Sequence, residues 1–288
     1  MTMAGHDRSS LRKVRLYGVL IGLLGLMMLP FYAMFSSTLK PESEIFAAPA
    51  TLVPSDPSLQ AYLQVWTQTD VLLWVANSFI ISVGTVVLTL LLAIPAAYSC
   101  ARNDFVGKRT FLLSVLVVQM FAPVVLIVGL FDVISQMGLF NTYLAVIVPA
   151  AAFTLPFNVW MLYGYFKTIP VALEESARID GASQLQILTK IVLPLTKPAL
   201  VASVTYTFLY AWNRLLFVLT FLTDSAKYNI PRGVFSMVGA LQTDWRMMLT
   251  VSVIGIIPLL ILFAFLGACH RIHLIASHSP ARFLARSW

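Results

Sequence analysis

Long blocks of apolar residues constrain the fold of this chain more than any other feature of its sequence. Six stretches have this character: about 16–35, 72–99, 110–132, 142–164, 199–222 and 249–270. A helix needs about 20 mainly apolar residues to cross the hydrocarbon core of a bilayer. The composition points the same way, because only 11% of the residues are charged, against about 25% in a soluble domain. The sequence therefore predicts an all-α, polytopic membrane protein with six transmembrane helices.

The fourth stretch has the least defined boundaries, because it contains Pro149 and Pro156. A proline removes one backbone hydrogen bond from a helix, but neighbouring helices can satisfy the freed carbonyl group in a membrane bundle. We therefore still expect one helix over residues 142–164.

Basic residues are divided unevenly between the segments that connect these helices. Fourteen Lys and Arg residues fall in the N-terminus, the 100–109 loop, the 165–198 loop and the C-terminal tail, whereas four fall in the opposite loops. Lys and Arg concentrate on the cytoplasmic side of membrane proteins, so both termini and the 165–198 loop are predicted to be cytoplasmic. The net charge of +7 is mainly a topology signal, and no nucleic-acid partner is expected.

These observations predict a simple organisation in a cell inner (plasma) membrane. A basic cytoplasmic N-terminus (1–15) precedes one transmembrane domain (16–270), which includes the 165–198 loop, and a basic cytoplasmic tail (271–288) follows.

The 165–198 loop is far more polar than the sequence around it. Pro170 can occupy the first turn of a helix, and Glu174 and Glu175 follow where the helix dipole favours negative charge. Glu174 also has the i,i+4 spacing to pair with Arg178. A short helix is therefore predicted after Pro170.

A turn and a second short helix should follow. Gly181 can end the first helix, since glycine accepts the left-handed conformation common just past a helix C-terminus. Ser183 and Gln186 have the spacing of a capping box, so the second helix should begin near Gln184 and end at Pro194. Its apolar side is expected to comprise Leu185, Ile187, Leu188 and Ile191. Such a helix–turn–helix can dock into another protein, and it can equally be a solvated connector.

The same loop resembles the signature of permeases in binding-protein-dependent ABC importers. That signature is Glu-Ala-Ala, three residues, Gly, nine residues and Ile-x-Leu-Pro. The matching positions here are Glu175, Ser176, Ala177, Gly181, Ile191, Leu193 and Pro194, and Ser176 is the only departure.

Other segments are similar to the carbohydrate branch, specifically to the second, six-helix maltose-type permease subunit. They are SSTLKPESEIF (36–46), ANSF (76–79), ARNDFVGKR (101–109) and AWNRLLFVLTFL (211–222). Two features depart from that subfamily: Arg214 stands where an acidic residue is usual, and the tail lacks the common Gly-Ala-Val-Lys-Gly ending.

The resemblance implies a type I ABC importer permease fold, with a cytoplasmic coupling helix between helices 4 and 5 that inserts into a separate ATPase. The residues it assigns to coupling are Glu174, Glu175, Ser176, Ala177, Asp180, Gly181 and Ala182. The implied partners are a second homologous permease, two copies of the ATP-binding subunit, and an extracytoplasmic or lipid-anchored solute-binding protein.

This chain is expected to be a transport subunit without a cofactor of its own. ATP and Mg²⁺ should bind the partner ATPase, since the only Gly-Lys pair, Gly107-Lys108, lacks the phosphate-binding loop pattern. No metal site is expected at His270, His273 and His278, because no matching cluster of Cys or acidic residues accompanies them.

Polar residues within the apolar blocks are the candidates for a translocation pathway. They are Asn77, Gln119, Asn158, Asn213 and Arg214, with Tyr206 and Tyr210 as rings that could stack on a sugar. Each amide could instead tie two helices together. Arg214 has three alternatives: its head snorkels to the interface, it pairs with an acid of a partner permease, or it binds an anionic or hydroxyl-rich solute.

The solute class follows from the resemblance, which implies a sugar or sugar derivative. An ABC importer permease for another solute is the nearest alternative. A proton-coupled secondary transporter would need acids within the membrane, and Asp132 at a helix end is the one weak candidate.

Overall fold

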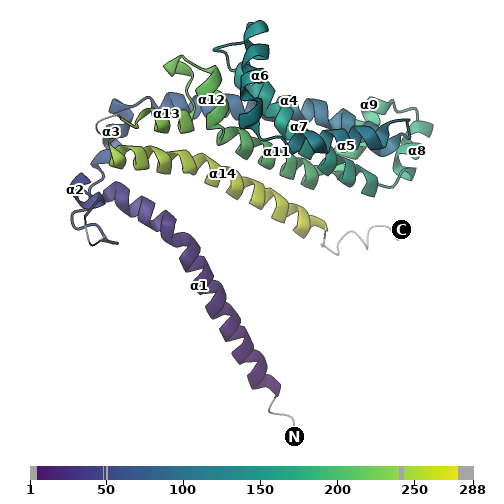
Figure 1. The fold of residues 1–288 in the computed structure, drawn as a ribbon. Coiled ribbons are helices and arrows are strands. Elements are labelled where there is room, and N and C mark those ends of the chain that lie inside the picture. The colour runs from purple at the N-terminus through teal and green to yellow at the C-terminus, as the bar shows by residue number, and fades with distance from the viewer. Residues whose placement is uncertain (1–4, 48, 50, 240–242, 278–288) are drawn as a thin grey trace. The chain divides into compact units, whose positions relative to one another are not determined.

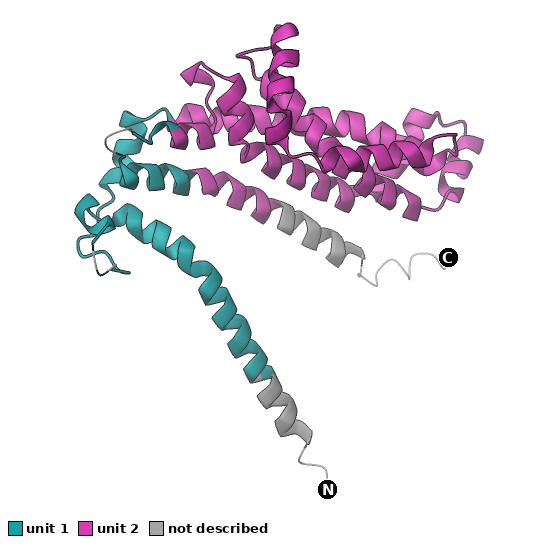
Figure 2. Ribbon diagram, viewed as in Figure 1, with its two compact units in different colours: residues 1–70, 236–254 teal, residues 71–235, 255–288 magenta. Residues whose placement is uncertain are grey.

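The computed structural model describes residues 5–47, 49, 51–239 and 243–277. The regular elements in this part of the chain are helices (Figure 1). The chain divides into two compact units, coloured teal and magenta in Figure 2. Unit 1 comprises Met1–Asp70 and Ser236–Ile254, and unit 2 comprises Val71–Phe235 and Gly255–Trp288.

Unit 1 contains α1 (Gly5–Leu39), α2 (Glu42–Ile45), α3 (Gln60–Gln68) and the first turns of α14 (Trp245–Ser277). The end of α1 is tied to α3 by a hydrogen bond of 3.0 Å between the hydroxyl groups of Thr38 and Tyr62. In the intervening loop, the hydroxyl groups of Thr51 and Ser55 donate hydrogen bonds to the Glu44 carboxylate and lower the pKa of that group. Short-range contacts thus shape the connection between α1 and α3.

Unit 2 holds the remaining elements. They are α4 (Val71–Arg102), α5 (Lys108–Gln119), α6 (Pro123–Gln136), α7 (Leu144–Thr168), α8 (Ala172–Ile179), α9 (Gln184–Ile187), the π-helical turn η1 (Leu188–Val192), α10 (Leu193–Leu195), α11 (Lys197–Trp212), α12 (Leu215–Phe221), the 3₁₀ turn η2 (Ser225–Lys227) and α13 (Ile230–Ser236), with α14 ending in this unit.

Helix α7 is the centre of unit 2, where it packs against both α4 and α11 (Figure 1). Small residues such as Ala150 and Ala199 are fully buried and let the helix backbones approach closely. Threonine hydroxyl groups join the helices, since Thr89 of α4 and Thr154 of α7 hydrogen-bond at 2.9 Å. Apolar helices packed through small residues and hydroxyl groups are typical of a membrane bundle.

Within the described part of the chain, four helical segments are long and apolar enough to cross a membrane: Arg15–Leu39, Val71–Arg102, Leu144–Thr168 and Trp245–Phe265. Two bent pairs raise this number to six if each pair is one span, namely Lys108–Gln119 with Pro123–Gln136 (101°) and Gln184–Leu195 with Lys197–Trp212 (83°). Pro149 and Pro156 do not interrupt α7. The expected helix 142–164 is therefore observed, with slightly later ends.

The expected continuous helix over 110–132 is wrong in detail, because α5 ends at Gln119 and α6 begins at Pro123. Proline has no backbone N–H and its ring clashes with the preceding turn, so the chain starts a new helix in a new direction. Pro123 occupies the first turn of α6, where its missing N–H costs least.

The expected helix over 199–222 is also broken, although neither Pro nor Gly lies at the break. Helix α11 ends at Trp212, and α12 begins at Leu215. The side-chain amide of Asn213 donates to the carbonyl oxygen of Leu209 at 2.9 Å, and its backbone N–H bonds the same oxygen at 3.2 Å, so Asn213 closes the last turn of α11. Arg214 takes a non-helical conformation with φ −85° and ψ 89°.

Candidate functional site

Two short helices and a glycine turn form the polar end of unit 2, and we call residues 171–187 the α8–α9 segment. Gly181 has φ +84°, and the N–H groups of Gly181 and Ala182 bond to the carbonyl oxygens of Arg178 and Ala177, at 3.0 and 2.9 Å. These two bonds define a Schellman C-cap, which glycine allows at low conformational cost. The glycine turn predicted from the sequence is therefore confirmed.

The predicted capping box at the start of α9 is confirmed as well. The Ser183 hydroxyl accepts from the Gln186 N–H at 3.3 Å, and the Gln186 side chain accepts from the Ser183 N–H at 2.9 Å. The helical run continues one residue past Pro194, to Leu195. Local hydrogen bonds thus define both ends of the turn, through the backbone at Gly181 and through side chains at Ser183 and Gln186.

One face of the α8–α9 segment packs on the bundle core, and the other face is exposed. Ile187 is fully buried in a cluster that includes Phe166 of α7. Leu185, expected on the same apolar side, is 70% exposed. The reason is that residues two apart on a helix point to opposite sides, so Leu185 faces out where Ile187 faces in. The π-helical turn after α9 then lets Ile187 and Val192 share the buried face.

The residues that the sequence assigned to coupling differ in exposure. Glu175, Ser176, Asp180 and Gly181 are exposed, Ala177 and Ala182 are half-buried, and Glu174 is buried. Ile179 is 87% exposed between them, so it adds an apolar contact to the exposed face together with Leu185. The segment thus offers an acid, a turn and two apolar side chains to the outside.

Glu174 faces inward and is held by the end of α4. Its carboxylate accepts from the Arg102 Nε at 2.6 Å and from the Tyr98 hydroxyl at 2.7 Å. Arg102 also donates from Nη2 to the carbonyl oxygen of Ile169 at 3.2 Å. The expected pair with Arg178 is therefore wrong, because the carboxylate points into the bundle and pairs with Arg102.

We call Tyr98, Arg102 and Glu174 the α4 anchor. Glu174 is 0% exposed and the Arg102 side chain is 7% exposed, so the ion pair is shielded from solvent screening. Breaking one partner of such a pair is costly, because the other charge remains buried. The anchor therefore fixes the α8–α9 segment to α4. Tyr98 and Arg102 were not identified from the sequence, where Arg102 counted only as a topology charge.

Asn77 is buried and fully bonded within unit 2. Its amide donates to the carbonyl oxygens of Ala226 and Tyr228 at 2.8 and 2.9 Å, and its oxygen accepts from the Tyr143 hydroxyl at 2.8 Å. This side chain joins α4 to α7 and to the segment around η2.

Asn158 is also buried, and it joins α7 to α11. Its amide donates to the Thr154 carbonyl at 2.8 Å and to the Thr207 hydroxyl at 2.9 Å. Gln119 and Asn213 are exposed at the ends of α5 and α11, at the two helix breaks. The two buried amides act as ties between helices, whereas the exposed ones remain available to a solute or a partner.

Aromatic rings form a continuous ladder that ends at Arg214. The ring centroids of Phe157 and Tyr206 are 4.1 Å apart, and those of Tyr206 and Tyr210 are 6.3 Å apart. The Arg214 guanidinium lies 3.6 Å from the Tyr210 centroid. Its Nε is buried and has no hydrogen-bond partner among the described residues. One face of the guanidinium is therefore covered by the Tyr210 ring, and its Nε has no acceptor among the described residues.

Among the described residues, no group of three His, Cys, Asp or Glu side chains lies close enough to hold a metal ion. The side chains of His270, His273 and His278 lie outside the described part of the chain.

A bundle of apolar helices with an exposed helix–turn–helix at one end defines a multi-pass integral membrane protein of the permease class. The chain belongs to the family described as "Binding-protein-dependent transport system inner membrane component", which matches residues 90–273. Proteins of this family are transport subunits of the inner membrane.

Named relatives agree with this assignment. The chain is 31% identical over 260 residues to the inner membrane ABC transporter permease protein YcjP of Escherichia coli (strain K12), and the match covers 90% of this chain and 93% of YcjP. It is 37% identical over 213 residues to the trehalose/maltose transport system permease protein MalG of Thermococcus litoralis, covering 73% and 72% of the two chains. It is 32% identical over 226 residues to the sulfoquinovosyl glycerol transport system permease protein SmoH of Agrobacterium fabrum, covering 78% and 79%.

The fold is similar to that of a chain in the crystal structure of a bacterial ABC transporter involved in the import of the acidic polysaccharide alginate. The TM-score is 0.74 at 22% sequence identity, and the match covers 93% of this chain and 99% of that chain. At this identity the likeness shows the fold alone, and that fold is an ABC importer permease fold.

Proposed function

We propose that this chain is the permease subunit of an ATP-driven importer for a sugar or sugar derivative, and that it takes its motion from a separate ATPase. The observation that carries the proposal is the two-faced α8–α9 segment. Glu174 and Ile187 fix its inner face to the bundle, while Glu175 and Gly181 stay exposed on its outer face. A joint that transmits motion between two subunits needs one face fixed to its own chain and one face free to contact the partner.

The outer face has the chemistry of a docking surface. Ile179 and Leu185 are 87% and 70% exposed, and large exposed apolar side chains beside an acid favour a protein partner over bulk water. In this proposal the apolar pair enters a cleft of the ATP-binding subunit, and Glu175 pairs with a basic residue there. Glu174 is committed to Arg102, so its role is to orient the segment.

The remaining subunits follow from the transport system to which the family belongs. We propose a second homologous permease, two copies of the ATP-binding subunit that bind ATP and Mg²⁺, and an extracytoplasmic or lipid-anchored solute-binding protein. The excess of Lys and Arg supports a cytoplasmic position for both termini and for the α8–α9 segment. Closure of the ATPase pair would then pull on the α8–α9 segment and bias the bundle between two states.

The ladder of Phe157, Tyr206, Tyr210 and Arg214 is the proposed contribution of this chain to the translocation pathway. Apolar ring faces suit the C–H faces of a sugar, and the arginine donors suit hydroxyl or acidic groups. Exposed Gln119 and Asn213 add amide groups at the two helix breaks. Relatives named for trehalose/maltose and for sulfoquinovosyl glycerol support the sugar class.

The test uses the complex purified with its ATPase, second permease and binding protein. Gly181→Val places a β-branched residue at φ +84°, so the turn cannot form and solute-stimulated ATP hydrolysis should be lost. Gly164→Val is the matched control, because an added Cβ there meets nothing within 4 Å and its φ is not positive. Gly181→Asn should keep part of the activity, since asparagine tolerates this conformation. Full activity of Gly181→Val at normal expression would contradict the proposal.

A further inference from the structure

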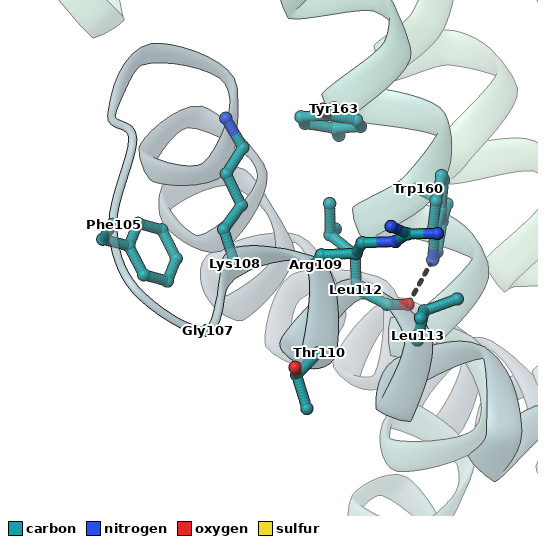
Figure 3. Close-up of a pocket in the computed structure, with 9 residues that line it drawn as sticks. All are labelled: Phe105, Gly107, Lys108, Arg109, Thr110, Leu112, Leu113, Trp160 and Tyr163. Carbon is teal, nitrogen blue, oxygen red and sulfur yellow. Dashed lines mark hydrogen bonds between the residues drawn. The ribbon is translucent and has the colours of Figure 1, made fainter.

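A pocket with basic and aromatic walls lies where the α4–α5 loop meets α7 (Figure 3). It has a volume of about 530 Å³, and Arg109, Leu112, Leu113, Trp160 and Tyr163 are among the residues that line it. The Trp160 indole N–H donates to the Leu112 carbonyl at 2.8 Å, which joins the α5 and α7 walls. Figure 3 shows the Arg109 side chain reaching toward the Trp160 indole.

The charges around the pocket favour an anion. Lys108 and Arg109 lie in the first turn of α5, where the positive end of the helix dipole makes cations unfavourable, and that turn has no acid. Lys167 approaches from α7, with its Nζ 5.3 Å from the Tyr163 ring centroid. No acid is among the residues that line the pocket, and the neighbouring Asp104 pairs with Lys108 at 3.0 Å. An anion at this helix end would relieve the repulsion between the cations and the dipole.

Arg109 is the cation best placed to bind such a group. Its side chain makes no hydrogen bond or ion pair within the described part of the chain, whereas Lys108 donates to Asp104 and to the Asn103 carbonyl. A planar guanidinium presents paired donors that match a phosphate group.

The rest of the pocket is mainly apolar, with Thr110 as a polar exception, and such a lining suits an amphipathic anion better than a small hydrated one. Leu112 and Leu113 continue along α5 from the basic turn, and Trp160 and Tyr163 have the amphipathic rings that concentrate at membrane interfaces. The pocket also lies at the end of the bundle that carries the α8–α9 segment, since Arg102 at the end of α4 bonds to Glu174. Basic pockets between membrane helices on the cytoplasmic side suit anionic lipid headgroups.

We propose that this pocket binds one anionic phospholipid of the cytoplasmic leaflet, with its phosphate on Arg109 and Lys108 and an acyl chain along Leu112 and Leu113. The lipid would hold α5 against α7 next to the α4 anchor. The proposal rests on the cytoplasmic position of this end in the proposed function.

The test measures quenching of tryptophan fluorescence by brominated lipid. The full chain is reconstituted in phosphatidylcholine vesicles that contain a minority of dibrominated phosphatidylglycerol or, for comparison, dibrominated phosphatidylcholine. The Trp160→Phe variant assigns the part of the signal that belongs to Trp160. We expect stronger quenching of Trp160 by the anionic lipid.

Matched variants separate this site from general surface charge. Removing two basic residues near an anionic lipid should lower the affinity about thirtyfold, so Lys108→Gln with Arg109→Gln should lose the preference. Lys197→Gln removes an exposed charge outside the pocket and should keep it. Arg109→Lys should retain most of it, which controls for misfolding.

Equal quenching of Trp160 by the two brominated lipids would overturn the proposal. It would also be overturned if Lys197→Gln lost the preference for the anionic lipid as fully as Lys108→Gln with Arg109→Gln. Competition by inorganic phosphate would also overturn it, since it would show a small-anion site. The measurement needs neither ATPase nor solute, so its failure is distinct from a failure of coupling.

Discussion

The α4 anchor makes opposite predictions for two neighbouring glutamates. Glu174→Ala leaves the Arg102 Nε and the Tyr98 hydroxyl buried without their acceptor, whereas Glu175→Ala removes an exposed carboxylate. Breaking a buried ion pair costs about 3–5 kcal/mol. Arg102 keeps its bond to the Ile169 carbonyl, so we expect the lower end, about 3 kcal/mol.

A local free-energy loss of this size raises the open population of the α8–α9 segment about a hundredfold, at about 1.4 kcal/mol per factor of ten. Trypsin cleavage after Arg178 in the detergent-solubilised full chain reports that population, because α8 must unfold locally before it is cut. The Glu174→Ala variant should therefore be cleaved much faster than wild type, and Glu175→Ala within about twofold of wild type.

A double variant tests the pairing itself. Arg102→Met with Glu174→Met replaces the buried charges by apolar side chains, which is often close to neutral, so much of the protection should return. Equal cleavage of Glu174→Ala and Glu175→Ala, with intact helices elsewhere, would refute the argument.

Two further outcomes follow from the topology and from the aromatic ladder. A cysteine at Ser183 should be labelled by an impermeant reagent only after the cells are permeabilised, since the α8–α9 segment is expected to be cytoplasmic; labelling of intact cells would contradict that side. Arg214→Lys should keep part of the uptake, whereas Arg214→Met and Arg214→Glu should lose it. A positive charge within an apolar span costs free energy, so we expect its charge, rather than its size, to be what transport requires. Unchanged uptake by Arg214→Met would remove Arg214 from the pathway.

The parts of the site that depend on sequence neighbours were predictable. The C-cap at Gly181 and the capping box of Ser183 and Gln186 rely on bonds within five residues, and their residue types have strong local preferences. The long apolar helices were predictable for a different reason, which is that the thickness of the bilayer sets the length of a spanning helix.

The inward orientation of Glu174 depends on contacts between distant segments. Glu174 and Arg102 are 72 residues apart, and nothing in either neighbourhood shows that the two side chains meet. Leu185 and Ile187 are two residues apart, so a helix places them on opposite sides, and the π-helical turn that follows keeps Ile187 and Val192 on the buried one. The break after Asn213 contains neither Pro nor Gly, so no local signal marks it in the sequence.

The central claim is that a separate ATPase drives this permease through the α8–α9 segment, and uptake into proteoliposomes tests it most directly. With the complete complex, a labelled sugar should accumulate only when ATP is supplied on the side of that segment, and a protonophore should have no effect. Glu175→Lys should abolish uptake, and a reversed charge on the ATPase should restore part of it. Uptake that persists without the ATPase subunits and follows a proton gradient would contradict the account.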